Sequence, residues 1–237
     1  MKAFAEYHSH TIYSDGKKTM AEMVAEAHRL GYEIFGISDH GYKHSFFGVK
    51  YHEYPKMRDE LNRLQEQYPD MKLLLGVEAN ILDDKGTIDV DDYILNYVDY
   101  VMAGYHFGSK PAGVRGLANH INNYSKVFSH KEVEYNTNAL IHAMKNNDLF
   151  ILTHPGDKGE IDTIEVAKVA EQTDTVLEIN ARHAHLSLKQ LMEVKDLDIK
   201  FSVGSDAHKL EHLPLIADAI DRAQIAGIDK SRIINVK

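Results

Sequence analysis

The sequence of 237 residues contains no cysteine and no tryptophan. The absence of cysteine excludes disulfide bonds, thiolate metal ligands, iron–sulfur clusters and a cysteine nucleophile, so any metal ion must be bound by nitrogen and oxygen. No apolar run approaches the roughly 18–20 residues that cross a bilayer, and the first residues, MKAFAEYHSH, lack the apolar core of a secretory signal. We therefore expect a cytoplasmic protein that does not enter a membrane.

Positive charge is also scarce, because 27 Lys and Arg residues face 36 Asp and Glu residues, a formal net charge of −9. A protein that binds nucleic acid through a broad basic face needs the opposite balance, so a nucleic-acid partner is disfavoured. With 43% hydrophobic residues the chain can bury one sizeable core. No Pro-, Gly- or Ser-rich linker divides it, which predicts a single domain over residues 1–237. The abundant residue is histidine, with 15 copies.

Short apolar runs rich in β-branched residues alternate with longer segments whose apolar residues recur every three or four positions, and this alternation predicts βα units. The seven expected strands are Ala3–His8, Ile34–His40, Lys72–Ile81, Tyr100–His106, Phe150–His154, Val176–Asn180 and Lys200–Ser205. Repeated βα units either close into a barrel or remain an open sheet.

Capping signals predict where several helices begin and end. The expected capping pairs are Thr19 with Glu22, Asp162 with Glu165, and Ser187 with Gln190. The helix that begins at Thr19 should end at Gly31, and the helix that begins at Asp162 should run to about Thr173. Pro214 should occupy the first position of a final helix that ends before Gly227.

The segment 107–131, FGSKPAGVRGLANHINNYSKVFSHK, is rich in Gly and Asn and is long for a βα connection. We expect it to be an active-site loop or lid.

Potential metal ligands stand at the ends of six of the seven expected strands. They are His8, His10, His40, Glu78, His106, His154, Asp206 and His208, and Asp15 in the loop YSDG is a ninth candidate. In a parallel barrel the carboxyl ends of the strands converge on one face, whereas an open sheet would spread these residues in a line. The pattern therefore favours a closed or nearly closed (βα)7 barrel of the α/β class.

Spacing supports a shared centre, because the outer residues of His8-Ser9-His10 and of Asp206-Ala207-His208 are two apart and point to the same side in extended chain. Nine ligands exceed what one ion needs and suit two or three metals, with a carboxylate such as Glu78 as the bridge. The alternative for any single histidine is a hydrogen-bonded core residue, but this alternative does not account for the whole set.

The remaining histidines are assigned less specific places. His28 and His142 fall within expected helices, and His52 and His212 flank helix starts. Five others lie in loops on the same face and remain open: His44, His120, His130, His183 and His185.

Seven motifs in order, HSHTIYSDG, ISDHG, GVEANI, GYHFG, LTHPG, LEIN and VGSDAH, resemble the PHP (polymerase and histidinol phosphatase) superfamily. The similarity covers residues 6 to 208 and is strongest to the small stand-alone YcdX-like phosphatase branch, through GVEANILDDKGTID, ILTHPGDKGEID and the ending RIINV. This resemblance implies a distorted (βα)7 TIM-like barrel with three divalent metal ions, most commonly zinc, with manganese or iron as alternatives.

The resemblance also implies a ligand set for each ion. Transferred residue by residue, it gives His8, His10, Glu78 and Asp206 to one ion; Glu78, His106 and His154 to a second; and Asp15, His40 and His208 to a third. Three divalent ions against three carboxylates would form an electropositive pocket suited to a phosphate dianion.

The expected reaction is hydrolysis of a phosphomonoester of a small molecule, in which a metal-activated hydroxide attacks phosphorus in line. We assign Glu78, Asp206 and His10 as catalytic residues. Arg182 is the leading candidate for a phosphate contact because its planar group matches phosphate oxygens, and Arg115 and His183 are further candidates. The expected partner is a small phosphorylated substrate, and a homo-oligomer is left open.

Several alternatives remain. GYHFG is similar to the histidinol-phosphatase form of its motif, so histidinol phosphate is the second choice of substrate. A PHP-type phosphodiesterase or exonuclease is disfavoured by the lack of a basic stripe. A metal amidohydrolase would place a modified lysine where this chain has Glu78 and His106. A metal-dependent binding module without catalysis is the last alternative.

Overall fold

Seven parallel strands lie side by side in the order of the chain, from β1 to β7. The computed structural model describes residues 1–237. The strands are β1 (Ala5–Glu6), β2 (Ile34–Ile37), β3 (Lys72–Asn80), β4 (Tyr100–Gly104), β5 (Ile151–Leu152), β6 (Val176–Asn180) and β7 (Phe201–Gly204). All seven expected strands are present, and most are shorter than expected because their last residues leave the sheet.

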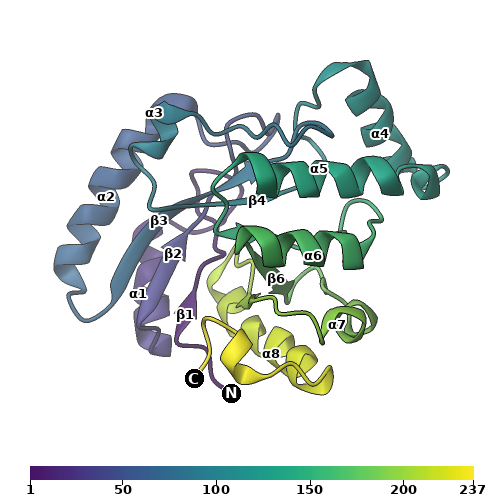
Figure 1. The fold of residues 1–237 in the computed structure, drawn as a ribbon. Coiled ribbons are helices and arrows are strands. Elements are labelled where there is room, and N and C mark those ends of the chain that lie inside the picture. The colour runs from purple at the N-terminus through teal and green to yellow at the C-terminus, as the bar shows by residue number, and fades with distance from the viewer.

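Helices alternate with the strands and cover the outside of the sheet (Figure 1). The α-helices are α1 (Met20–Leu30), α2 (Tyr54–Gln67), α3 (Asp92–Leu95), α4 (Gly113–Ser125), α5 (Val133–Asn146), α6 (Thr163–Thr173), α7 (Leu188–Val194) and α8 (Ile216–Ile225). Short 3₁₀ helices are η1 (Tyr51–Glu53), η2 (Ser129–Lys131), η3 (Leu210–Leu215) and η4 (Lys230–Arg232). The predicted α/β barrel with seven βα units is confirmed.

The capping signals place three helix starts correctly. The side chains of Thr19, Asp162 and Ser187 each accept a hydrogen bond from the backbone three residues later. The prediction for Pro214 was wrong: this residue lies inside η3, and α8 begins two residues later. Proline lacks an N–H group and is tolerated in the first turn of a helix, so the sequence signal could not separate a 3₁₀ turn from the helix that follows it.

The expectation of a loop over 107–131 is corrected, since α4 and η2 occupy most of this segment. Its apolar residues do recur with helical spacing, but they face outward: Val114 is 86% exposed and Tyr124 is 71% exposed. The buried face carries Asn119 and Asn123, and the Asn123 side chain donates to Asn136 of α5 at 2.9 Å. The Gly and Asn content of the segment favours a loop, but in the structure two of its Asn residues form the buried face of a helix.

The barrel is closed between β1 and β7 by backbone and side-chain contacts. His10 N donates to Ala207 O at 2.8 Å, and Ala207 N donates to His8 O at 3.2 Å. Nearer the amino ends of the same two strands, the fully buried Asn235 side chain donates to Ala5 O at 2.9 Å and to Val203 O at 2.8 Å. The C-terminal residues thus fill the gap between the first and last strands, and the two termini lie side by side (Figure 1).

Alternating residues of β4 pack into two different hydrophobic clusters. On β4, Val101 and Ala103 join the large core under the helices, while Tyr100 and Met102 belong to a small inner cluster. A Cβ at Gly76 would overlap the Tyr100 ring, so glycine makes room for this ring inside the barrel.

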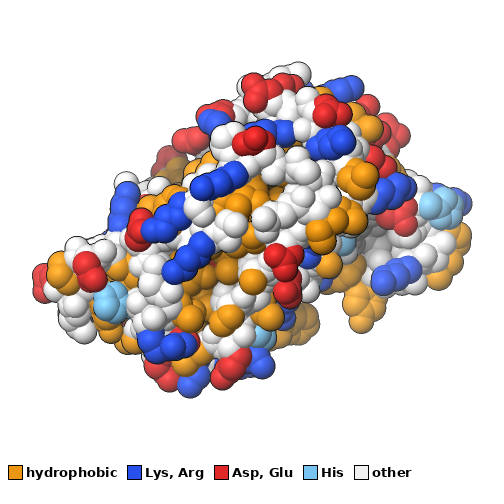
Figure 2. Space-filling view, turned by 90° about the horizontal axis from the view of Figure 1, so that it is seen from below, with side chains coloured by type: hydrophobic (Ala, Val, Ile, Leu, Met, Phe, Trp, Pro, Cys, Tyr) orange, Lys and Arg blue, Asp and Glu red, His pale blue; other side chains and the backbone are white.

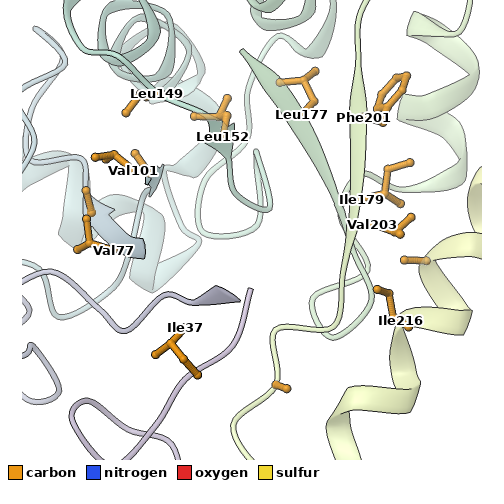
Figure 3. Close-up of a cluster of buried hydrophobic side chains, with 14 of the residues drawn as sticks. Ile37, Val77, Val101, Leu149, Leu152, Leu177, Ile179, Phe201, Val203 and Ile216 are labelled. Atoms are coloured by element: carbon orange, nitrogen blue, oxygen red, sulfur yellow. The ribbon is translucent and has the colours of Figure 1, made fainter. Parts of the chain in front are cut away.

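The outer core lies between the sheet and its helices. Ile179 and Val203 are paired across β6 and β7, and they point towards Ile216 of α8 (Figure 3).

Acidic and basic side chains are interspersed on the face seen from below in Figure 1, where both termini lie (Figure 2). Neither sign forms a continuous stripe on that face. Every helix is too short or too polar to span a lipid bilayer.

Candidate metal centre

The inward residues at the carboxyl ends of the strands form one buried cluster. It contains His8 and His10 after β1, His40 after β2, Glu78 in β3, His106 after β4, His154 after β5, and Asp206 and His208 after β7, with Asp15 from the loop after His10. All nine candidates from the sequence therefore lie together. Because inward and outward residues alternate along each strand, the barrel itself aims these side chains at a common point.

Glu78 is fully buried at the middle of the cluster. Its Oε1 lies 3.0 Å from His106 Nε2, 2.9 Å from His154 Nε2 and 3.3 Å from His8 Nε2. Its Oε2 lies 2.9 Å from His40 Nδ1 and 3.6 Å from His10 Nε2. One carboxylate thus contacts histidines from four different strands.

Asp15 forms the outer side of the cluster. Its Oδ1 lies 3.1 Å from His208 Nε2, 3.7 Å from His40 Nε2 and 3.8 Å from His10 Nδ1. These four residues offer ligand atoms that all lie within 4.8 Å of one another. This spacing suits coordination of a single cation.

Asp206 lies between the residues around Glu78 and those around Asp15. Its Oδ1 lies 3.4 Å from His10 Nε2 and 3.2 Å from His208 Nδ1. Both Asp206 and His154 have positive φ angles, of 50° and 26°, a backbone conformation that costs about 1 kcal/mol or more for a residue with a side chain. The sharp change of chain direction at these two residues carries their side chains into the centre.

The carboxylates at the centre are held in the ionised form. Burial alone would raise the pKa of Glu78, but the positive charges of His106, His8 and His40 hold this pKa well below its usual value. Negative oxygen atoms are therefore available at neutral pH, as a cation requires.

The pKa values of the neighbouring residues His208 and His10 are shifted in opposite directions. Burial opposes the charge of His208, but the neighbouring carboxylates of Asp15 and Asp206 outweigh burial and raise its pKa to about 9. Burial and the positive charges of His208 and His40 lower the pKa of His10 to about 3. In the metal-free protein the imidazoles therefore share the available protons unequally.

The chemistry of the donor atoms fits divalent cations. Six buried ligand atoms have no hydrogen-bond partner in the protein: His8 Nε2, His10 Nε2, Asp15 Oδ1, His40 Nδ1, Glu78 Oε2 and Asp206 Oδ1. Leaving a buried polar atom without a partner costs about 1–3 kcal/mol, so such a concentration requires a compensating interaction. Imidazole nitrogens and carboxylate oxygens are the ligands that zinc and manganese accept.

Glu178 is a functional residue that the sequence analysis missed. Its Oε1 lies 2.6 Å from His8 Nδ1, and its Oε2 accepts a hydrogen bond from His154 N at 2.8 Å. A Cβ at Gly204 would overlap the Glu178 carboxylate, so a glycine on β7 permits this position. The carboxylate fixes His8 with its Nε2 towards the centre. The motif LEIN contains the signal, since Glu178 is inward in β6 as Glu78 is in β3.

Two more buried acids, Asp89 and Asp39, form hydrogen bonds with residues next to the candidate ligands. Asp89 accepts hydrogen bonds from Asn80 N at 2.6 Å and Asn80 Nδ2 at 2.7 Å, and Asn80 Oδ1 lies 3.0 Å from His106 Nδ1. Asp39 accepts from Thr11 N at 2.7 Å and so orders the turn that leads to Asp15. Asn80 lies two residues after Glu78 on the same strand face, a spacing that could have identified it.

Of the three residues expected to contact phosphate, two line the pocket above the cluster. Arg182 and His183 both line the pocket above the cluster. Arg182 Nη1 lies 3.5 Å from Asp206 Oδ1, and His183 Nε2 lies 3.1 Å from Asp206 Oδ2. Asp157 Oδ2 lies 3.1 Å from the other nitrogen of His183 and holds this ring in place.

Arg115 is not among the residues that line this pocket. It lies on α4, where its Nη2 is 2.6 Å from Glu132 Oε2 and its guanidinium stacks on Tyr135. The local ion pair determines its position, and we do not retain it as a phosphate contact.

The histidines that the sequence left open fall into two groups. His44 lines the pocket and stacks on His40, with ring centroids 5.0 Å apart, and His185 Nδ1 lies 3.7 Å from Asp157 Oδ1. His120 instead lies 3.1 Å from the Tyr105 hydroxyl, and His130 is exposed in η2.

The model of the PHP domain family matches residues 6–196. The chain belongs to the PHP domain family. A probable phosphatase of Caldanaerobacter subterraneus is 30% identical to it, over 99% of this chain and 88% of the relative. The probable phosphatase YcdX of Escherichia fergusonii is 26% identical, over 98% and 89%. The DNA polymerase/3′-5′ exonuclease PolX of Bacillus subtilis is 26% identical over 98% of this chain, which spans 39% of that protein.

Among solved structures, histidinol phosphate phosphatase from Lactococcus lactis, complexed with zinc, L-histidinol and phosphate, superimposes with a TM-score of 0.66. The alignment covers 96% of this chain and 95% of that one at 16% identity, a level that supports the fold. The predicted family and the predicted class of phosphoric ester hydrolase are confirmed by these comparisons.

Cation binding should release protons at pH 7. The pKa of His208 is about 9 in the metal-free protein, so the ring is protonated at pH 7 and must lose a proton before it coordinates. Affinity should consequently fall as the pH is lowered from 9. Titration calorimetry with Zn²⁺ in two buffers of different ionisation enthalpy measures the release; equal heats in both buffers would contradict it.

Replacing Glu178 by Gln should weaken metal binding about 10- to 100-fold, because the amide no longer holds the His8 ring by a charged hydrogen bond. Competition with a chromophoric chelator measures this affinity, and Glu134→Gln on the exposed face of α5 is the matched control. Unchanged affinity in Glu178→Gln would show that His8 does not depend on this carboxylate.

Proposed function

We propose that this protein is a metal-dependent phosphatase that hydrolyses phosphomonoesters of small molecules at a centre of three divalent cations. The observation that carries the proposal is the convergence of six buried ligand atoms without hydrogen-bond partners. The phosphatase relatives and the zinc-bound structural neighbour support the reaction class and the need for metal.

We assign the ligands to three sets, two of which share Glu78. His8, His10, Glu78 and Asp206 would hold one cation; Glu78, His106 and His154 a second; and Asp15, His40 and His208 a third. The short distances from Glu78 Oε1 to His106 and His154 favour the second set, and the group around Asp15 favours the third. Zinc fits these donors best, with manganese or iron as alternatives.

When bound, the cations neutralise negative charge on the phosphate and acidify a water molecule for attack on phosphorus. The residues of the chain supply orientation. Glu78, Asp206 and His10 would hold the cations, and their burial keeps bulk water from the ligand atoms. Arg182 and His183, at the rim, would bind the phosphate oxygens and set the direction of the ester bond.

One narrower function and one different reaction are the alternatives. A histidinol phosphatase is favoured by the fold of the Lactococcus lactis enzyme. A phosphodiesterase or exonuclease is favoured by the match to PolX. A metal amidohydrolase remains the most distant alternative, since this chain has Glu78 and His106 where that class would place a modified lysine.

The zinc- or manganese-loaded protein should hydrolyse p-nitrophenyl phosphate in preference to bis-p-nitrophenyl phosphate and to p-nitroanilide amides. Glu78→Gln should lower kcat/KM for p-nitrophenyl phosphate at least about 100-fold, because this carboxylate contacts both sides of the centre. Glu66→Gln, on the exposed face of α2, is the matched control. Release of p-nitrophenol from the esters and of p-nitroaniline from the amides is the measurement, and preference for the diester or the amides would refute the proposal. Release of inorganic phosphate from histidinol phosphate tests the narrower alternative.

A further inference from the structure

We propose that the substrate carries a second phosphate group, which binds in a basic cleft beside the metal centre. This inference rests on the proposed phosphatase function and specifies its substrate class. The cleft, called here the side cleft, is lined by Lys17, Lys209, Arg182, His212 and Phe47 together with Asp15 and His208 of the centre.

The side cleft and the pocket above the cluster adjoin each other. Both are lined by Asp15, Phe47, Arg182 and His208. The pocket above the cluster has a volume of about 160 Å³ and the side cleft about 480 Å³, so the side cleft has room for a second group. A ligand with one group at the cations can therefore extend past Arg182 into the side cleft.

The charge of the side cleft is opposite to that of the whole chain. Lys17, Lys209 and Arg182 are three positive groups in a protein with a formal net charge of −9. Asp15 is the one acidic lining residue, and its Oδ1 faces His208 Nε2 at 3.1 Å. Three positive groups in a concave surface attract an anion with two charges, which a phosphate supplies.

The side cleft is attached to the ligand-bearing segments of the centre. Lys17 follows Asp15 by two residues, and its backbone N donates to His208 O at 2.7 Å. Lys209 follows His208 directly. His212 Nδ1 accepts a hydrogen bond from His208 N at 3.3 Å, so the neutral ring carries its proton on Nε2 as a further donor. The backbones of Lys17 and Lys209 are thus held next to the centre.

The expected substrate class is a small organic bisphosphate, such as a sugar bisphosphate. The phosphate that is hydrolysed would lie at the cations, the second one at Lys17 and Lys209, and the organic part against Phe47.

The test compares fructose 1,6-bisphosphate with fructose 1-phosphate and fructose 6-phosphate on the metal-loaded protein. The kcat/KM for the bisphosphate should exceed that for either monophosphate about tenfold, as expected for two partly exposed ion pairs. In the Lys17→Met/Lys209→Met double variant this ratio should fall towards one. The control variant, Lys168→Met/Lys195→Met, removes the same charge from exposed sites elsewhere and should keep the ratio.

The outcomes separate the two proposals. Hydrolysis of monophosphates with no preference for the bisphosphate, or a preference that survives in the double variant, overturns the second site alone. Failure to hydrolyse any phosphomonoester overturns the proposed function and this inference with it. Faster release of nucleotides from a single-stranded oligonucleotide than hydrolysis of the bisphosphate would also overturn the inference. Equal metal content in all variants establishes that the centre is intact.

Discussion

A buried carboxylate surrounded by histidines is the constraint on which this structure depends. Glu78 has no exposed surface, and its two oxygen atoms lie within 3.6 Å of nitrogen atoms from five imidazole rings. Protons alone cannot satisfy such an arrangement, because burial disfavours charged imidazoles and adjacent ones repel each other; burial and the charges of His208 and His40 together lower the pKa of His10. Divalent cations satisfy it, since each can accept lone pairs from several of these groups at once.

The scaffold maintains this arrangement by a second set of buried polar groups. Glu178 holds His8, and Asn80 connects His106 to Asp89. The same geometry that closes the barrel also places the ligands, because the contact between His10 and Ala207 joins the two ligand-bearing ends of β1 and β7. Stability and metal binding are therefore coupled, and the free energy gained from cations offsets the cost of burying these groups.

The repeating pattern in the sequence was sufficient to predict the strands, the barrel and the nine clustered ligand candidates, because parallel strands bring their carboxyl ends together whatever the loops do. The inward position of Glu178 could be read from the motif LEIN, but its contact with His8 could not, since nothing in a local pattern reveals which imidazole a carboxylate will hold. The helix α4 was missed because the Gly and Asn content of 107–131 favours a loop, whereas Asn119 and Asn123 form the buried face of a helix. The place of Arg115 depends on Glu132, a partner 17 positions away that no spacing rule identifies.

The most direct test of the account is anomalous diffraction from crystals of the protein reconstituted with zinc or manganese. The account predicts three anomalous peaks inside the barrel mouth, two of them within coordinating distance of Glu78 and the third between Asp15, His40 and His208. The absence of any peak near Glu78 in fully loaded crystals would contradict it.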